Sequence, residues 1–290
     1  MNHTRVLTLS DSRALQVIDN GIDSHRALVM LHGTPGVAEV WWTWLTRAAA
    51  LGVRAMAVTR PGYYVSDRRP VGKVVDLNRD FAEILNQCGI EEFVTLGWSG
   101  GGPYSLASTF LTGNKGADLV AGVASLFEMG PEFGVGGDNP LDDDIAGTES
   151  VENALALCAG IEDDMNNFVT AFFDDHVQTR PDYAEFAAQY AEARPHLSSF
   201  ATDALTVLIG LAEDSHTINN DWGFKVSDVT ARVDIWQGEI DKAVPVGHGR
   251  WLAAQMKNST LHELANQGHS TIMVEAREPI LQSAIAKLNA

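Results

Sequence analysis

The sequence predicts an α/β fold in which a mostly parallel sheet of about eight strands is flanked by helices. Short apolar and β-branched runs, which indicate buried strands, alternate with stretches that have the apolar spacing of helices. Such alternation requires right-handed crossovers and therefore a mostly parallel sheet. The expected strands, of which the first two form a hairpin, lie near residues 5–9, 14–19, 27–31, 53–59, 93–98, 119–127, 232–237 and 260–264.

The segment Gly97–Gly101, of sequence Gly-Trp-Ser-Gly-Gly, connects a predicted strand to a predicted helix with Pro103 in its first turn. A serine held between a strand and a helix by flanking glycines is the pattern of a nucleophile elbow. The turn is too tight for a side chain near the serine, whose own backbone is strained. The hydroxyl lies at a helix N-terminus, where free N–H groups can bind an oxyanion. Ser99 is therefore the predicted nucleophile.

Three other strand ends carry residues that a serine nucleophile needs. The strand at 27–31 leads directly into His32-Gly33-Thr34-Pro35-Gly36. Asp241 lies on the loop after the strand at 232–237, and His269 follows a glycine in the loop after the last strand. The order along the chain is thus serine, aspartate, histidine.

These motifs, which are spread over nearly the whole chain, resemble those of the α/β-hydrolase superfamily, in its capped, esterase or proline iminopeptidase-like branch. The resemblance implies an α/β-hydrolase fold and a catalytic triad of Ser99, Asp241 and His269. It also implies an oxyanion hole formed by the backbone N–H groups of Thr34 and Gly100. No metal and no organic cofactor are expected.

A turn after the fourth expected strand adds to the resemblance. Residues 60–67, Arg-Pro-Gly-Tyr-Tyr-Val-Ser-Asp, resemble the Asp-Arg-Pro-Gly-x-Gly-x-Ser turn of many capped members. Thr59 stands in place of the aspartate, and Tyr64 stands in place of the second glycine. These departures affect a structural turn near the pocket and leave the triad intact.

The acid of the triad has an alternative. Glu128 follows the expected strand at 119–127, and some proteins of this fold carry the acid there; otherwise Glu128 lines the pocket or contacts the cap. His32 is expected to hydrogen-bond its own turn. The neighbouring tryptophans at positions 41, 42 and 44 are interpreted as packing residues or as a wall of the acyl pocket. The candidate pocket residues are Gly33, Trp98, Glu128 and Trp41.

Residues 131–225 are predicted to form an all-helical cap inserted into a core made of residues 1–130 and 226–290. After a stretch at 130–149 that is rich in Gly, Pro and Asp, helical spacing of apolar residues recurs as far as residue 212. The segment 131–225 holds nineteen acidic and three basic residues, a net charge of −16 out of −18 for the chain. This acidic surface is either simply solvated or favours cationic substrates.

Composition excludes several other classes of protein. The 290 residues, 45% hydrophobic and 20% charged, are typical of a soluble enzyme. No apolar run reaches the roughly 18 residues of a membrane helix, and the N-terminus has no signal core. Cys88 and Cys158 indicate no disulfide framework, and the largest basic cluster, Arg68-Arg69, disfavours nucleic-acid binding. We expect a cytoplasmic enzyme that acts on a small molecule, with a homodimer left open.

The expected reaction is the hydrolysis of a carboxylic ester or lactone of small or medium size through an acyl-enzyme. His269 takes the proton of Ser99, and Asp241 orients the imidazole. One alternative is an aminopeptidase or amidase, because His32–Gly36 approaches the His-Gly-Gly-Pro-Gly of proline iminopeptidases. Hydrolysis of a carbon–carbon bond is a less favoured variant. A ligand-binding receptor without catalysis is disfavoured by the intact triad.

Overall fold

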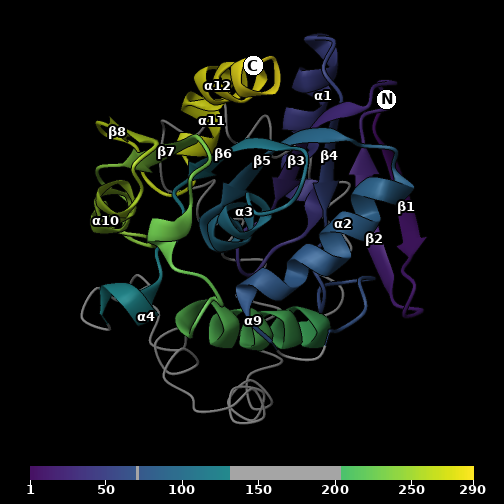
Figure 1. Cartoon of the computed structure of the whole chain (residues 1–290), viewed down its shortest axis with the longest axis horizontal. Helices are drawn as coiled ribbons and strands as arrows, with labels where there is room; N and C mark the ends of the chain where they lie inside the picture. Colours follow the sequence, from purple (N-terminus) through teal and green to yellow (C-terminus); the bar gives the residue numbers. More distant parts are fainter. Residues whose placement is uncertain (70–71, 131–203) are drawn as a thin grey trace.

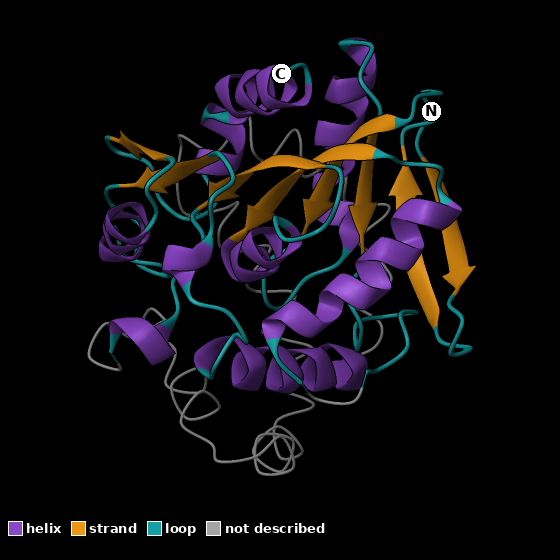
Figure 2. Cartoon of the chain, viewed as in Figure 1, coloured by secondary structure: helices purple, strands orange, loops and turns teal. Residues whose placement is uncertain are grey.

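The protein is built around one eight-stranded sheet, seen here in a computed structural model that describes residues 1–69, 72–130 and 204–290 (Figures 1 and 2). The spatial order is β1-β2-β4-β3-β5-β6-β7-β8. The β1/β2 and β2/β4 pairs are antiparallel and the other pairs are parallel. The predicted α/β-hydrolase fold is thereby confirmed. The strands are β1 (His3–Thr8), β2 (Ala14–Asp19), β3 (Arg26–Leu31), β4 (Ala55–Val58), β5 (Glu92–Trp98), β6 (Asn114–Val120), β7 (Val233–Gly238) and β8 (Ser259–Leu264).

Helices cover both faces of this sheet (Figure 2). One face packs against α1 (Trp42–Ala50), α11 (Ile272–Glu275) and α12 (Arg277–Leu288), and the other against α2 (Leu77–Gln87), α3 (Gly102–Ser108) and α10 (Gly247–Gln255). The last two helices, α11 and α12, are separated by Ala276 alone. No helix in the described part of the chain is long and apolar enough to cross a membrane.

The apolar run of the central strand β3 is continuous because both faces of the strand are buried. Ala27, Val29 and Leu31 belong to the core on the α2 and α3 side, whereas Leu28 and Met30 belong to the core on the α1 and α12 side. All five side chains are fully buried. A parallel strand covered on both faces needs apolar residues at every position, not at alternate ones.

The expected position of one strand was wrong. The strand predicted at 119–127 is β6 (Asn114–Val120), and the residues after it form a buried loop. Val123 N–H donates to the Ser99 carbonyl, and Ala121 has a φ of +47°. The apolar run therefore marks burial of this loop and not extended backbone. The true strand was missed because it contains polar residues, Asn114 and Lys115 at its start and the buried Asp118 farther along.

The helical spacing expected as far as residue 212 is described from residue 204 onward as α9 (Ala204–Asn219), which continues seven residues beyond that limit. It lies beyond the carboxyl ends of the central strands, close to α2 and α3 (Figure 1). The rest of the expected helical spacing, from residue 150 to 203, lies outside the described residues, so the cap at 131–225 stays a prediction.

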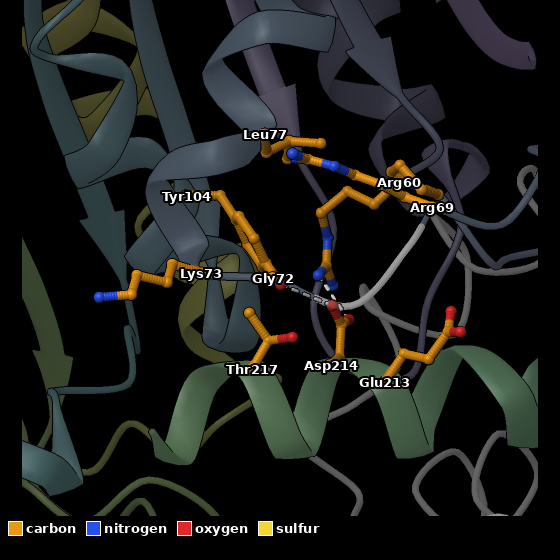
Figure 3. A pocket seen from close by; sticks show the side chains of 10 residues that line it. Arg60, Arg69, Gly72, Lys73, Leu77, Tyr104, Glu213, Asp214 and Thr217 are labelled. Atoms are coloured by element: carbon orange, nitrogen blue, oxygen red, sulfur yellow. Dashed lines mark hydrogen bonds and ion pairs between the residues drawn. The ribbon is translucent and has the colours of Figure 1, made fainter. Parts of the chain in front are cut away.

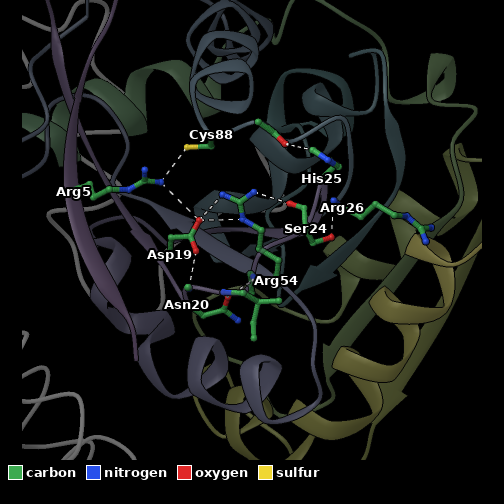
Figure 4. Close-up of polar contacts among 12 residues, drawn as sticks. Arg5, Asp19, Asn20, Ser24, His25, Arg26, Arg54 and Cys88 are labelled. Carbon is green, nitrogen blue, oxygen red and sulfur yellow. Dashed lines mark hydrogen bonds and ion pairs between the residues drawn. The ribbon is translucent and has the colours of Figure 1, made fainter.

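Polar side chains fix the antiparallel edge of the sheet (Figure 4). The β2/β4 ladder is short, from Val17↔Val58 to Asp19↔Met56. Beyond it, the Asn20 side chain accepts the Ala55 N–H at 3.1 Å and donates to the Val53 carbonyl at 2.9 Å. Asp19 accepts from the Arg54 guanidinium at 2.8 and 3.2 Å. These bonds extend the pairing of β2 and β4 past the last ladder pair.

A buried charge cluster joins α12 to the sheet. Lys287 Nζ lies 2.8 Å from an Asp118 oxygen and 2.7 Å from an Asp234 oxygen, and all three side chains are almost fully buried. The contact with Asp118 is a hydrogen bond, whereas that with Asp234 is an ion pair without hydrogen-bond geometry. Burial raises the pKa of Asp118. Burial also disfavours the charge on Asp234, but the hydrogen bond from His262 and the neighbouring Lys287 charge outweigh this effect and lower its pKa.

Replacing Lys287 by methionine tests this cluster. The substitution leaves two neighbouring buried carboxylates without their shared cation, so we expect the free energy of unfolding to fall by about 3–5 kcal/mol. Urea denaturation followed by tryptophan fluorescence measures the loss. The control is the exposed Lys257→Met, expected to change stability by less than about 0.5 kcal/mol. Equal stabilities of the two variants would contradict the interpretation.

Candidate active site

Ser99 lies in the tight turn between β5 and α3. Its φ of +53° is uncommon for a residue with a side chain and marks a strained backbone. A Cβ on Gly97 would collide with the Gly101 carbonyl, and a Cβ on Gly101 would collide with the Leu31 carbonyl. The expected strained serine and its requirement for glycines are both confirmed.

Asp241 and His269 are brought together by the loops after β7 and β8. Asp241 Oδ2 accepts from His269 Nδ1 at 2.9 Å, while its Oδ1 accepts the Ala243 and Val244 N–H groups, each at 2.9 Å. The Asp241 side chain is fully buried, whereas 14% of the His269 side chain is exposed. Because Nδ1 donates to the carboxylate, Nε2 of a neutral His269 carries a free lone pair. His269 thus presents a basic nitrogen at an accessible position.

Trp98 connects this pair to the Ser99 turn. Its indole N–H donates to the His269 carbonyl at 3.1 Å, and the two rings lie 5.4 Å apart. Since Trp98 immediately precedes Ser99, the His269 loop is held beside the turn. Within the described residues the Ser99 hydroxyl makes no hydrogen bond. Catalytic hydrogen bonds are often long or absent before substrate binds.

The predicted oxyanion residues lie against Ser99. A Cβ on Gly33 would lie 3.1 Å from the Ser99 Cβ and 3.2 Å from the Trp98 ring. A Cβ on Gly100 would lie 2.8 Å from the Thr34 Cβ. In the described part of the chain, the Thr34 N–H has no acceptor. The Gly100 N–H is in the first helical turn, where backbone donors lack intrahelical acceptors.

His32 is a structural residue of the same turn, as expected. Its Nε2 accepts the Arg60 N–H at 2.9 Å, so Nδ1 carries the proton and donates to the Gly33 carbonyl at 2.7 Å. Complete burial, followed by the Arg60 charge, lowers the pKa of His32 well below its ordinary value. His32 is therefore neutral and keeps this tautomer.

Glu128 and Trp41 are the two remaining candidates. Glu128 does not end a strand: it lies in α4 (Leu126–Met129), is exposed, and accepts the Val226 N–H at 3.1 Å. The carboxylate that bonds His269 is that of Asp241.

Trp41 is fully buried, and its ring lies edge-on to the Trp44 ring with the ring centres 5.0 Å apart. This is the expected packing role, and a place for Trp41 in the pocket stays a prediction.

Sequence reasoning missed a buried polar network beside Thr34. Arg60 and Asp214, 154 positions apart, form a buried ion pair, and Tyr104 donates to the same carboxylate at 2.8 Å. These three residues and Thr217 line a pocket between α9 and the core (Figure 3). Among the described residues, no group of three or more His, Cys, Asp or Glu side chains could hold a metal ion.

Comparisons with solved structures agree with the fold. An esterase from Exiguobacterium antarcticum superposes with a TM-score of 0.70 at 17% identity, over 99% of this chain and 100% of that chain. An alpha/beta hydrolase fold protein from Nakamurella multipartita gives a TM-score of 0.70 at 19% identity, with the same coverage. At these identities, the likeness establishes the fold.

Comparisons of sequence lead to the family. The chain is 28% identical over 258 residues to a 2-hydroxy-6-oxononadienedioate/2-hydroxy-6-oxononatrienedioate hydrolase of Cupriavidus pinatubonensis, covering 83% of this chain and 80% of the relative. A Klebsiella pneumoniae protein of the same name is 26% identical over 260 residues, with coverages of 85% and 82%. The family model for alpha/beta hydrolases matches residues 28–282. The chain therefore belongs to the alpha/beta hydrolase family.

Proposed function

We propose that this protein is a serine hydrolase that cleaves a carboxylic ester or lactone of small or medium size through an acyl-enzyme. The observation that carries the proposal is the 2.9 Å hydrogen bond between Asp241 and His269, held by Trp98 beside the strained Ser99. A histidine oriented by a buried carboxylate, next to a serine in such a turn, has the parts of a nucleophilic triad.

Each step of the mechanism uses one of these groups. His269 Nε2 takes the Ser99 proton as the hydroxyl attacks the ester carbonyl, and Asp241 stabilises the imidazolium that forms. The Thr34 and Gly100 N–H groups bind the tetrahedral oxyanion, each donor worth about 3–4 kcal/mol in the transition state. The imidazolium then protonates the leaving alcohol. Water, activated by the same histidine, releases the acid and frees Ser99.

The two relatives favour a second candidate, the hydrolysis of a carbon–carbon bond. Their names specify a ketone substrate with two carboxylates. A ketone contains no ester or amide bond, so its hydrolysis breaks a carbon–carbon bond after water or a nucleophile adds to the carbonyl. The same histidine and oxyanion groups serve that addition.

Charge favours the ester over the dicarboxylate. The proposed cap, residues 131–225, carries a net charge of −16. Ile218 of α9, one of the described segments of this range, lies beside Gly100, so α9 reaches the site. A cap of this charge placed over the pocket, as we propose, would repel a dianion and leave a neutral ester unaffected. We therefore place the ester or lactone first and the ketone second.

Ser99→Ala tests the nucleophile. A fluorophosphonate probe is expected to label the wild-type protein and not the variant, because the probe reacts with an activated serine hydroxyl. Turnover of p-nitrophenyl butyrate should be lost with the labelling. The same panel includes an amino-acid p-nitroanilide and a 2-hydroxy-6-oxo dienedioate to choose among ester, amide and ketone. Full ester hydrolysis by the alanine variant would refute the mechanism.

Asp241→Asn tests the acid. The amide no longer stabilises the imidazolium and favours the wrong tautomer of His269, so kcat should fall by about 10⁴-fold. The matched control is Glu128→Gln, which should retain kcat within about twofold, since Glu128 bonds the Val226 N–H and not His269. Initial rates with p-nitrophenyl butyrate give both values. The reverse ranking would move the acid to Glu128.

The charge argument is tested by salt. We expect kcat/KM for an anionic p-nitrophenyl ester to rise with ionic strength, because salt screens the cap over a Debye length of about 10 Å at 0.1 M. A matched neutral ester should be nearly insensitive and an amino-substituted ester should slow. Identical salt slopes for the three esters would show that the acidic residues face bulk water and do not select substrates.

A further inference from the structure

The buried network around Asp214 converges on the turn that carries Thr34. The Asp214 carboxylate accepts from Thr34 Oγ1 at 2.9 Å, from the Tyr63 hydroxyl at 2.7 Å and from the Tyr104 hydroxyl at 2.8 Å, and it pairs with Arg60 Nη1. Asp214 is 6% exposed and Arg60 is 1% exposed. One carboxylate on α9 therefore joins four donors from three separate parts of the core.

Burial and the neighbouring charges determine the protonation states in this network. Burial, and next the Asp214 charge, raises the pKa of Tyr63 and Tyr104 well above the ordinary value, so both hydroxyls are neutral donors. Burial disfavours the charge on Arg60, but the neighbouring Asp214 charge outweighs it and raises the pKa of Arg60. The guanidinium also lies 4.7 Å from the Tyr104 ring centre, a favourable cation–π distance.

Arg60 holds the backbone of the Thr34 turn. Its Nη2 donates to the Gly33 carbonyl at 2.9 Å, to the His32 carbonyl at 3.1 Å and to Thr34 Oγ1 at 3.1 Å. The Gly33 carbonyl also accepts from His32 Nδ1 at 2.7 Å. Two donors thus fix the direction of this one carbonyl.

The direction of the Gly33 carbonyl determines the direction of the Thr34 N–H. Both groups belong to the same planar trans peptide, in which the C=O and N–H bonds point in opposite directions. With the carbonyl turned toward Arg60, the N–H is turned away from it, and in the described part of the chain that N–H has no acceptor. A rotation of this peptide would withdraw the donor from the oxyanion.

We propose that Arg60 and Asp214 are positioning residues that hold the Gly33–Thr34 peptide with its N–H available to the oxyanion of the reaction. The inference rests on the proposed function and extends it to α9. Arg60 fixes the carbonyl side of the peptide, and Asp214 neutralises Arg60 and fixes the Thr34 hydroxyl. The placement of α9 therefore sets the geometry of the oxyanion site.

Asp214→Asn is the first test, and Glu213→Gln is its matched control. Glu213 is the adjacent acid on α9, and it pairs with Arg68 on the core without touching the Thr34 turn. We expect Asp214→Asn to lower kcat for p-nitrophenyl butyrate by about 10- to 100-fold with KM within about threefold, since oxyanion contacts act in the transition state. Glu213→Gln should change kcat by less than about twofold.

A tetrahedral inhibitor separates positioning from a purely structural role. A trifluoromethyl ketone forms an oxyanion on Ser99, so its inhibition constant should rise in Asp214→Asn in parallel with the loss of kcat/KM. A variant that is less stable to heat but retains kcat and the inhibition constant would overturn the proposal. If Asp214→Asn does not fold, Thr34→Val decides, because it removes the hydroxyl and keeps the shape; unchanged kcat and inhibition in Thr34→Val would also overturn it.

The failure of this inference is distinct from failure of the proposed function. If wild-type protein takes no fluorophosphonate label and hydrolyses no ester, the function itself is wrong. If wild-type protein is labelled and active, and Asp214→Asn matches it in kcat and in ketone inhibition, the function stands and the role of Arg60 and Asp214 is refuted.

Discussion

The close packing of the turn between β5 and α3 is the constraint on which the rest of the site depends. Gly102, at the start of α3, leaves a Cβ position only 3.1 Å from the Gly122 Cα, so the helix begins directly against the loop after β6. Ser99 is forced to a positive φ, a strain of about 1–3 kcal/mol that the surrounding core must offset. This turn brings Ser99, the N–H groups at the start of the helix and the Thr34 turn close together.

The sequence was informative wherever local geometry demands a particular residue. The glycines around Ser99 and the polar residues Asp241 and His269 just after strand ends follow from backbone sterics and from the polarity of a parallel sheet. Both positions were predicted at the correct strand ends, and the two side chains are joined by a hydrogen bond. Tyr64 is instructive too: it occupies the place of a glycine in the family turn, and its φ is +51°.

What could not be predicted depends on contacts between distant parts of the chain. Asp118 interrupts the apolar residues of β6, and nothing near it in sequence indicates that Lys287, 169 positions away, neutralises it inside the core. In the sequence, Asp214 is one of many acids in a strongly acidic segment. Only the folded structure shows that it is buried and paired with Arg60. Periodicity and turn motifs report local preference, whereas pairing of buried charges is decided by the assembled fold.

The two buried ion clusters raise the question of why charges are retained in the core at all. Removing two charges from water costs several kcal/mol for each ion, and well-packed apolar residues often stabilise a core as well or better. An apolar substitute, however, cannot set the orientation of a peptide group. The forked guanidinium of Arg60 can, because it bonds two consecutive carbonyls and a hydroxyl of one turn. By this reasoning Arg60 and Asp214 are retained for the direction they impose on one N–H, whereas Lys287 pairs with acids of β6 and β7 and attaches α12 to the sheet.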